Sequence, residues 1–391
     1  MKNSIKRAAS LLLALVLVFS LAGCYSEDMT WAAKCGDETM PIGGYIYYLS
    51  TAYTEAAAKV DSAEKVMDSQ IEEKNAEEWI RDRAAHYIRQ YFWMDEEMER
   101  LGIEMTDADY ENASATTNSY WTIYGGDEMF EEYGIARSSF DIAFSQYNIK
   151  FQKIFEAIYG EGGEKEVPES DLIAQFTDNY YSYEYFTAPM ALPDASGNPV
   201  AMTEDEKEAF REHMEDVKSE ILSGDKTVAD AAADYAAAYN QEKTSYVKEV
   251  NNPSGLAGSS LPTAFLESLA GLQENELTVL EVSNYMVILR RLPIKDSVNE
   301  MLEDASSRLT VLSEVKSEEY REYAESCAEE FEGIEFNTKA MEHYKPKMFV
   351  NDDTEYGTLS SVEISTADDE TVDEDSAETS SEESSEESAE E

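Results

Sequence analysis

Apolar residues recur every three or four positions along most of the first 180 residues. This spacing is typical of amphipathic helices, and it begins just after Pro41. A second, longer helix is expected over residues 62–100, and a short strand is expected at 30–34, before the first helix. The pattern therefore predicts a mostly helical segment over residues 41–179. The clearest stripe positions are Ile42, Tyr45, Ile46, Leu49, Trp79, Ile80, Tyr87, Ile88, Phe140, Phe144, Phe151 and Phe155.

The pattern changes at Tyr180, where short aromatic or β-branched runs begin to alternate with helical stripes. The two residues between the last two runs, Ser283 and Asn284, suit a tight hairpin. The order β-α-α-β-α-β-β predicts a compact α+β unit with a four-stranded sheet flanked by helices. Its strands are expected at 180–187, 245–250, 278–282 and 285–292.

A long amphipathic helix resumes after this unit, with apolar positions from Leu302 to Phe331. A helix with an apolar side needs a partner, and no helical partner lies nearby except in the first segment. We therefore expect the terminal helix to pack on the N-terminal helices and to leave the strand-rich unit as an insertion.

Five sites with the spacing of a capping box predict helix starts. In this motif a Ser or Thr side chain and an acidic side chain three residues later satisfy each other's backbone N–H groups. The pairs are Thr106/Asp109, Ser138/Asp141, Thr203/Glu206, Thr227/Asp230 and Ser297/Glu300.

The first residues have the order of a secretory signal: basic Lys2, Lys6 and Arg7, then an apolar run too short to span a bilayer. The sequence Leu-Ala-Gly-Cys that ends at Cys24 resembles the lipobox of bacterial lipoproteins. The resemblance implies that residues 1–23 are removed and that Cys24 carries a lipid. Ordinary secretion with a chance cysteine is the alternative. We expect a protein anchored by lipid on the extracytoplasmic face of a bacterial cell membrane.

The net charge of −53 is unevenly distributed. Residues 351–391 hold 17 acidic residues and no Lys or Arg, so residues 350–391 are expected to form a disordered acidic tail. The remaining residues carry 66 acidic side chains against 30 Lys and Arg. Such a charge repels nucleic acid and favours basic or neutral partners.

The cysteines and histidines are few and scattered, with three of each. If Cys24 is acylated, Cys35 and Cys327 remain, and both a disulfide and two buried thiols stay open as interpretations. The spacing contains no metal-ligand motif and no glycine-rich phosphate loop. We expect no metal or cofactor.

Several segments together resemble the PrsA/SurA family of parvulin-type extracytoplasmic foldases. The residues that carry the resemblance are Trp31–Glu38, Val167–Leu172, Gly224–Tyr235, Leu261–Phe265 and Leu269–Leu292. The resemblance implies a helical SurA-N-like chaperone domain at 24–179, completed by a C-terminal helix at 293–349, and an inserted parvulin-like domain at 180–292.

The sequence departs from that family at its paired active-site histidines. The corresponding positions hold Tyr185 and Met286, and His86, His213 and His343 lie on neither strand. Tyr185, Leu261, Phe265 and Met286 are the candidate groove for a proline or peptide, and core packing is the alternative role for them. No catalytic residue is assigned.

The resemblance implies a lipid-anchored foldase or chaperone that binds unfolded segments of secreted proteins. Its peptidyl-prolyl cis-trans isomerase activity is expected to be weak or lost, because the polar half of the site is missing. The alternatives are an active parvulin-type isomerase with an altered site and a solute-binding lipoprotein. The last of these needs two α/β lobes, which the helical first segment disfavours.

Overall fold

The computed structural model describes residues 28–350 apart from 124, 194–198 and 240–243. The expected signal peptide, Cys24 and residues 351–391 of the expected tail lie outside this part. The described residues form an α+β structure, mostly helical, with small antiparallel sheets, which confirms the predicted class. No helix within the described residues combines the length and apolar content needed to span a bilayer.

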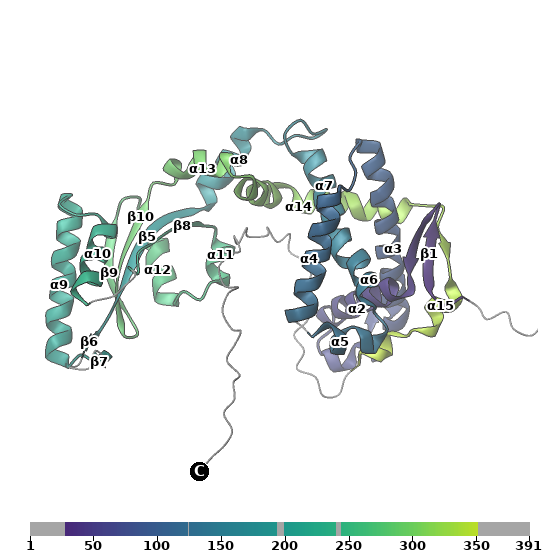
Figure 1. Cartoon of the computed structure of the whole chain (residues 1–391), viewed down its shortest axis with the longest axis horizontal. Coiled ribbons are helices and arrows are strands. Elements are labelled where there is room, and N and C mark those ends of the chain that lie inside the picture. Colours follow the sequence, from purple (N-terminus) through teal and green to yellow (C-terminus); the bar gives the residue numbers. More distant parts are fainter. Residues whose placement is uncertain (1–27, 124, 194–198, 240–243, 351–391) are drawn as a thin grey trace, which may run out of the picture.

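Helices gather at one end of the molecule and the four-stranded sheet lies at the other (Figure 1). Between them lie α8 (Glu169–Asn179), α13 (Val298–Glu303) and one end of the long helix α14 (Ala305–Glu330). The helical part also contains α2 (Ile42–Ala58), α3 (Ala76–Leu101), α4 (Asp107–Ile123), α5 (Gly126–Met129), α6 (Arg137–Phe140), α7 (Tyr147–Tyr159) and the 3₁₀ helix η2 (Glu131–Tyr133).

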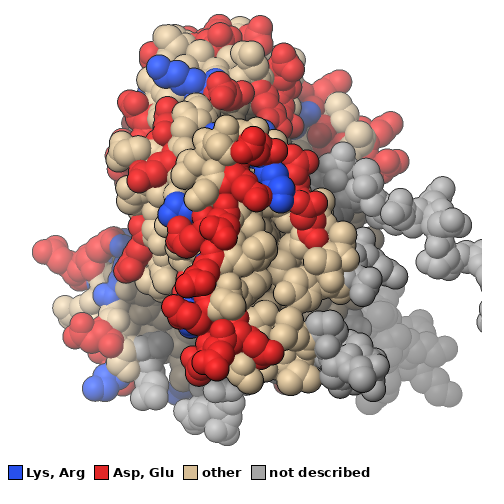
Figure 2. All heavy atoms as spheres, turned by 90° about the vertical axis from the view of Figure 1, so that its left-hand side faces the viewer, with Lys and Arg blue, Asp and Glu red and all other residues tan. Residues whose placement is uncertain are grey.

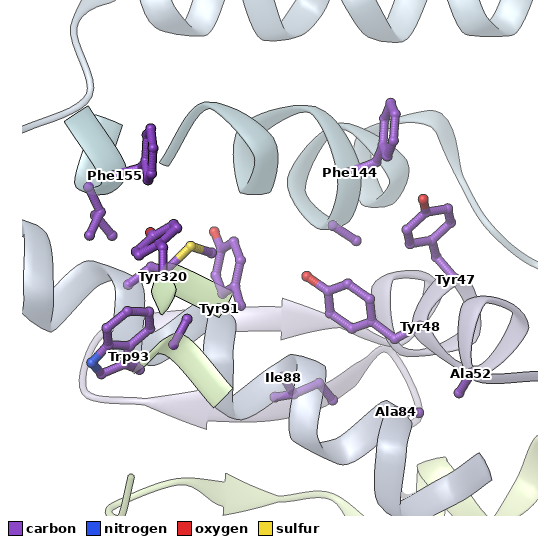
Figure 3. Packing of buried hydrophobic residues seen from close by; sticks show 14 of the residues in the cluster. Tyr47, Tyr48, Ala52, Ala84, Ile88, Tyr91, Trp93, Phe144, Phe155 and Tyr320 are labelled. Carbon is purple, nitrogen blue, oxygen red and sulfur yellow. The ribbon is translucent and has the colours of Figure 1, made fainter. Parts of the chain in front are cut away.

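Aromatic side chains from four helices fill the core of the helical part. Figure 3 shows four of them within this core: Tyr48 of α2, Tyr91 of α3, Phe155 of α7 and Tyr320 of α14. Tyr320 is fully buried, and its hydroxyl donates a hydrogen bond of 2.8 Å to the carbonyl oxygen of Phe151. The long helix α14 thus packs on α3 and α7, far away from it in the sequence.

A small three-stranded sheet joins the two ends of the described chain. Its order is β11-β1-β2, formed by Glu335–Phe336, Trp31–Cys35 and Glu38–Pro41. Ala33 pairs with Phe336, and the Asn337 side-chain amide donates to the carbonyl oxygen of Asp28 at 2.8 Å. The final short helices, α15 (Thr338–His343) and η5 (Pro346–Phe349), pack beside α2, so both chain ends lie on the helical part.

The second helix begins later than its predicted start at residue 62. Residues 63–75 instead form the 3₁₀ helix η1 (Ala63–Asp68) and a short hairpin of β3 (Gln70–Ile71) and β4 (Lys74–Asn75). Glu72 and Glu73 adopt positive φ at the hairpin turn, a conformation that no helix continues through. The Asn75 side chain then caps α3 by accepting a hydrogen bond from the Glu78 backbone N–H.

Three of the five predicted capping boxes are confirmed, at Thr106, Thr203 and Thr227. The other two are wrong. Ser138 lies inside α6, and Asp141 begins the π-helical turn η3 (Asp141–Gln146), where it accepts hydrogen bonds from Thr117 and Gln146. Ser297 is buried with its hydroxyl 3.3 Å from that of Ser182, and the helix breaks before Asp304 caps α14.

The four-stranded sheet has the order β8-β5-β10-β9, with every pair of neighbours antiparallel. Helices α9 and α10 cover one face, and the shorter α11 and α12 cover the other. The predicted hairpin at Ser283 and Asn284 is confirmed, with Ser283 at φ 56°. The elements are β5 (Tyr181–Pro189), β6 (Ala191–Pro193), β7 (Pro199–Ala201), α9 (Glu204–Ser223), α10 (Val228–Ala238), β8 (Val247–Asn251), α11 (Pro253–Gly258), α12 (Thr263–Gly271), β9 (Leu277–Val282), β10 (Tyr285–Leu292) and η4 (Ile294–Ser297).

Candidate functional site

The candidate groove lies on the sheet face that α12 covers, and the two central strands supply its floor. Residues that alternate along a strand share a face, so Tyr183 and Tyr185 of β5 point to the same side. Leu289 of β10 pairs directly with Tyr185, and directly opposite residues also share a face. Val287, two residues before Leu289, therefore joins them, and all four belong to one apolar cluster.

Phe265 of α12 packs its ring against both tyrosines. The centre of its ring lies 4.9 Å from that of Tyr185 and 6.0 Å from that of Tyr183, and both pairs are edge-to-face. This is a favoured arrangement for aromatic pairs, because the positive ring edge meets the negative ring face. Pro262 lies just before the helix, in extended conformation, and thus sets where α12 starts.

The apolar surface around these rings is only partly covered. Tyr183 and Phe265 are buried, whereas Tyr185 is half-buried. The predicted groove residue Leu261 lies in the same cluster and is also half-buried. The other half-buried side chains of this cluster are Tyr181, Leu266, Leu280 and Val282.

The prediction that Met286 lines this groove beside Tyr185 is wrong. Met286 pairs with Ala188, so it lies on the opposite face of the sheet and is buried among the side chains of α9 and α10. Successive side chains along a strand point to opposite faces of the sheet. Predicting that two strands are neighbours therefore does not tell which residues share a face until their register is known. The structure brings Tyr185, Leu261 and Phe265 together and replaces Met286 by Val287.

A polar cluster that sequence reasoning missed adjoins the aromatic face. The Tyr183 hydroxyl donates a 2.6 Å hydrogen bond to Glu249 Oε2 and accepts one of 3.0 Å from Asn251 Nδ2. Burial and the Glu249 carboxylate raise the pKa of Tyr183, so the hydroxyl stays protonated and keeps donating. In the sequence, the one sign of this cluster is that Glu249 and Asn251 are two residues apart on β8 and so share a face. This spacing does not identify the Tyr183 hydroxyl as their partner.

The histidines and the remaining cysteines lie away from this face. His86 is on α3, His213 packs beside Phe210 on α9, and His343 is on α15. Cys35 and Cys327 are free, half-buried thiols, and burial raises the pKa of both. Within the described residues, no group of three or more His, Cys, Asp or Glu side chains is arranged to hold a metal ion.

The outer surface of the sheet-bearing part is strongly acidic. Figure 2 views the molecule from that end and shows Asp and Glu side chains in bands over the face that contains α9. Helix α9 alone has eight acidic residues against three Lys and Arg, and Arg211 is held by Glu281 at 2.8 Å. The field of this face favours cationic partners.

The fold and the candidate site define an α+β protein whose small antiparallel sheet presents a half-covered aromatic face, with no histidine on its strands.

No protein-family model matches the chain, and no curated protein matches it either. Among solved structures, the chain is similar to the foldase protein PrsA from Lactococcus lactis, at 11% identity and a TM-score of 0.34. The match covers 79% of this chain and 96% of that one. PrsA from Bacillus subtilis is similar at 11% identity and a TM-score of 0.30, over 65% of this chain and 86% of that one.

Proposed function

We propose that the protein is an extracytoplasmic foldase or chaperone, anchored by a lipid on Cys24, that binds unfolded segments of secreted polypeptides. The observation that carries the proposal is the half-covered aromatic face around Tyr185 and Phe265. A solvated apolar surface on rigid strands contacts extended chains without requiring one sequence. The sequence segments that resemble PrsA/SurA foldases support the same function.

We further propose two functional parts. The helical part, built from residues 24–179 and 293–349, is the chaperone domain, and residues 180–292 form a parvulin-like domain inserted in it. The contacts of α14 with α3 and α7 support the first, since they join segments from both ends of the chain. Ser182 and Leu292 pair between β5 and β10, so the two ends of the inserted segment lie side by side. This supports the proposal of an inserted domain.

Isomerase activity is proposed to be weak or lost. Rotation of a prolyl amide is accelerated by polar groups arranged around the twisted carbonyl, in a dry pocket. On this face the nearest polar groups, Tyr183, Glu249 and Asn251, bond to one another. Tyr185 also carries a hydroxyl beside the groove, and burial raises its pKa. An altered but active site at Tyr185 is the alternative.

Two assays on the mature protein test the proposal. The first measures light scattering by a reduced, carboxymethylated model protein during aggregation, and we expect the protein to suppress it. Tyr185→Asp should weaken the suppression by placing a charge on the aromatic face, whereas Leu222→Asp, on an exposed residue of α9 beyond the other face of the sheet, serves as the matched control. Unchanged aggregation in the presence of the wild-type protein would refute the chaperone function.

The second assay follows a proline-containing peptide in a protease-coupled reaction. We expect turnover close to the uncatalysed rate, both for the wild type and for Tyr185→Phe. Fast turnover that Tyr185→Phe abolishes would favour the alternative of an active isomerase with an altered site. Mass spectrometry of the protein from membranes tests the anchor, since it should detect the mass of a lipid on Cys24. In a separate fractionation, Cys24→Ser should release the protein into the medium.

A further inference from the structure

A pocket of about 310 Å³ opens in the helical part, where α3 ends and α4 begins. Met98 in the last turns of α3 is buried, and Ile103 and Met105 in the following loop are half-buried. Tyr110 of α4, 47% exposed, stands at the edge. Half of the lining residues are therefore apolar or aromatic, and methionine side chains adapt to ligands of different shape.

One side of the pocket holds an ion pair with a buried cation and a half-buried carboxylate. Lys150 of α7 is only 4% exposed, and its ammonium lies 2.5 Å from Asp95 Oδ1 and 4.1 Å from the centre of the Tyr91 ring. A buried ammonium needs such partners, because it has lost its hydration. It has three N–H donors, and Asp95 uses one of them.

The other carboxylate oxygen of the pair has no partner. Asp95 Oδ2 is buried and accepts no hydrogen bond in the described structure, and Asp95 also lines the pocket. Buried acceptors of this kind are nearly always satisfied, so this one calls for a donor. An extended polypeptide supplies an N–H donor and a carbonyl acceptor at every residue, and so matches both Asp95 and the unused donors of Lys150.

The pocket rim selects the charge of the ligand. Glu99 and Glu104 line the pocket and are exposed, and together with Asp95 they outnumber the single cation, Lys150. The remaining field is negative, so it attracts Lys or Arg next to the inserted residue and repels Asp or Glu. The volume is at the small end for ligand pockets and has room for one large side chain together with its adjoining backbone.

We infer that this pocket is a subsite for one apolar side chain, of the Leu, Met or Phe type, in an extended polypeptide with neighbouring Lys or Arg. The side chain enters between Met98, Ile103 and Met105, while the backbone bonds to Asp95 and Lys150. The inference deepens the proposed chaperone function and rests on it. The subsite lies on the helical part, separate from the aromatic face of the sheet.

Fluorescence anisotropy with labelled unstructured peptides tests the subsite on the mature protein. Three peptides are identical except for a central Lys-Phe-Lys, Lys-Ser-Lys or Glu-Phe-Glu. We expect only Lys-Phe-Lys to bind well. Met105→Lys should weaken its binding about tenfold, as expected when an apolar contact is lost and a like charge is added. Tyr110→Ala, an exposed substitution that leaves folding intact, should weaken it about threefold, as loss of one partial aromatic contact predicts.

Leu222→Lys is the matched control, since Leu222 is 60% exposed on α9, and it should leave the affinity unchanged. Equal binding by the wild type, Met105→Lys and Tyr110→Ala overturns the subsite, as does equal binding of the three peptides or no binding of any. The aggregation assay distinguishes a wrong subsite from a wrong chaperone function. If the wild type and Met105→Lys suppress aggregation equally, the subsite is wrong while the chaperone function stands. If the wild type suppresses nothing, the proposed function itself fails.

Discussion

The hydroxyl of Tyr180 donates a hydrogen bond of 2.8 Å to Glu314 Oε1, across 134 residues of sequence. Tyr180 is the last residue before β5, and Glu314 lies on the long helix α14. The same carboxylate accepts from Gln175 on α8, at 3.0 Å, and from Asn252 at the start of α11. One glutamate therefore holds the sheet-bearing part against the helical part.

Tyr180→Phe should reduce the free energy of unfolding by about 1 kcal/mol, because a partly buried hydrogen bond to a charged acceptor is lost. Urea unfolding followed by far-UV circular dichroism measures this change. Tyr285→Phe is the control, since Tyr285 is 47% exposed at the hairpin, and it should change little. Equal effects of both substitutions would contradict a role for the hydrogen bond.

Tyr320→Ala should destabilise the protein by about 3–5 kcal/mol, the usual cost of removing a large buried aromatic side chain. Tyr320 is fully buried against Phe151 and Phe155, with ring centres 4.4 and 5.3 Å away. The urea midpoint of the helical part should fall strongly. Val350→Ala, at a 36% exposed position, should leave the midpoint nearly unchanged. A similar loss for both variants would mean that α14 does not close the core.

Stability at acid pH should depend on Glu325. Its Oε2 atom lies 2.8 Å from Arg83 Nη1 and 2.7 Å from His86 Nε2, both on α3. Burial raises the pKa of Glu325, but the hydrogen bonds and charges of His86 and Arg83 outweigh this and lower it to about 2. The folded-state pKa is thus below the ordinary value of 4.5. The ionised group stabilises the fold above that value, and this contribution is lost as the pH falls toward 2.

The wild type should therefore lose more stability than Glu325→Gln between about pH 5 and about pH 2.5. The difference should be modest, because the Glu325 side chain is 41% exposed and solvent screens the pair. Urea unfolding at several pH values measures it, with Glu329→Gln, an exposed residue of the same helix, as the control. Parallel curves for the wild type and Glu325→Gln would rule out this contribution.

Thr203→Ala should reduce stability by about 1 kcal/mol, the typical cost of losing an N-cap. The Thr203 side chain accepts from the Glu206 backbone N–H, and the Glu206 carboxylate accepts from the Thr203 backbone N–H at 2.8 Å. Thr203→Ser keeps the oxygen and should retain most of the stability. Thermal unfolding distinguishes the two, and equal midpoints for Thr203→Ala and Thr203→Ser would argue against the cap.

Local signals predicted much of the fold. The capping box at Thr227 and the hairpin at Ser283 depend on a few neighbouring residues, and both are confirmed. The prediction over residues 62–75 failed because helical spacing alone does not reveal a turn, and Glu72 and Glu73 accept positive φ there. The prediction of a cap at Ser297 was wrong for another reason. Its hydroxyl lies beside that of Ser182, a residue distant in sequence, which the local motif does not reveal.

The candidate groove was only partly predictable for a related reason. Phe265 and Leu261 were identified because the segment Leu261–Phe265 resembles one in the PrsA/SurA family. The facing of Met286 depends on the register between β5 and β10, which tertiary packing decides. Asp95 and Lys150 were not singled out, since an ion pair between two helices leaves no local pattern in a chain so rich in charge.

The pairing of β1 with β11 sets the order in which the chain can fold. Ala33 must wait for Phe336, so the helical part closes only when nearly the whole chain has been made. Contacts within residues 181–292 have lower contact order and close earlier, because shorter loops cost less entropy. Pulse-labelled hydrogen exchange during refolding should therefore show protection of the β5–β10 amides first. Earlier protection of the Ala33–Phe336 pair would reverse this order.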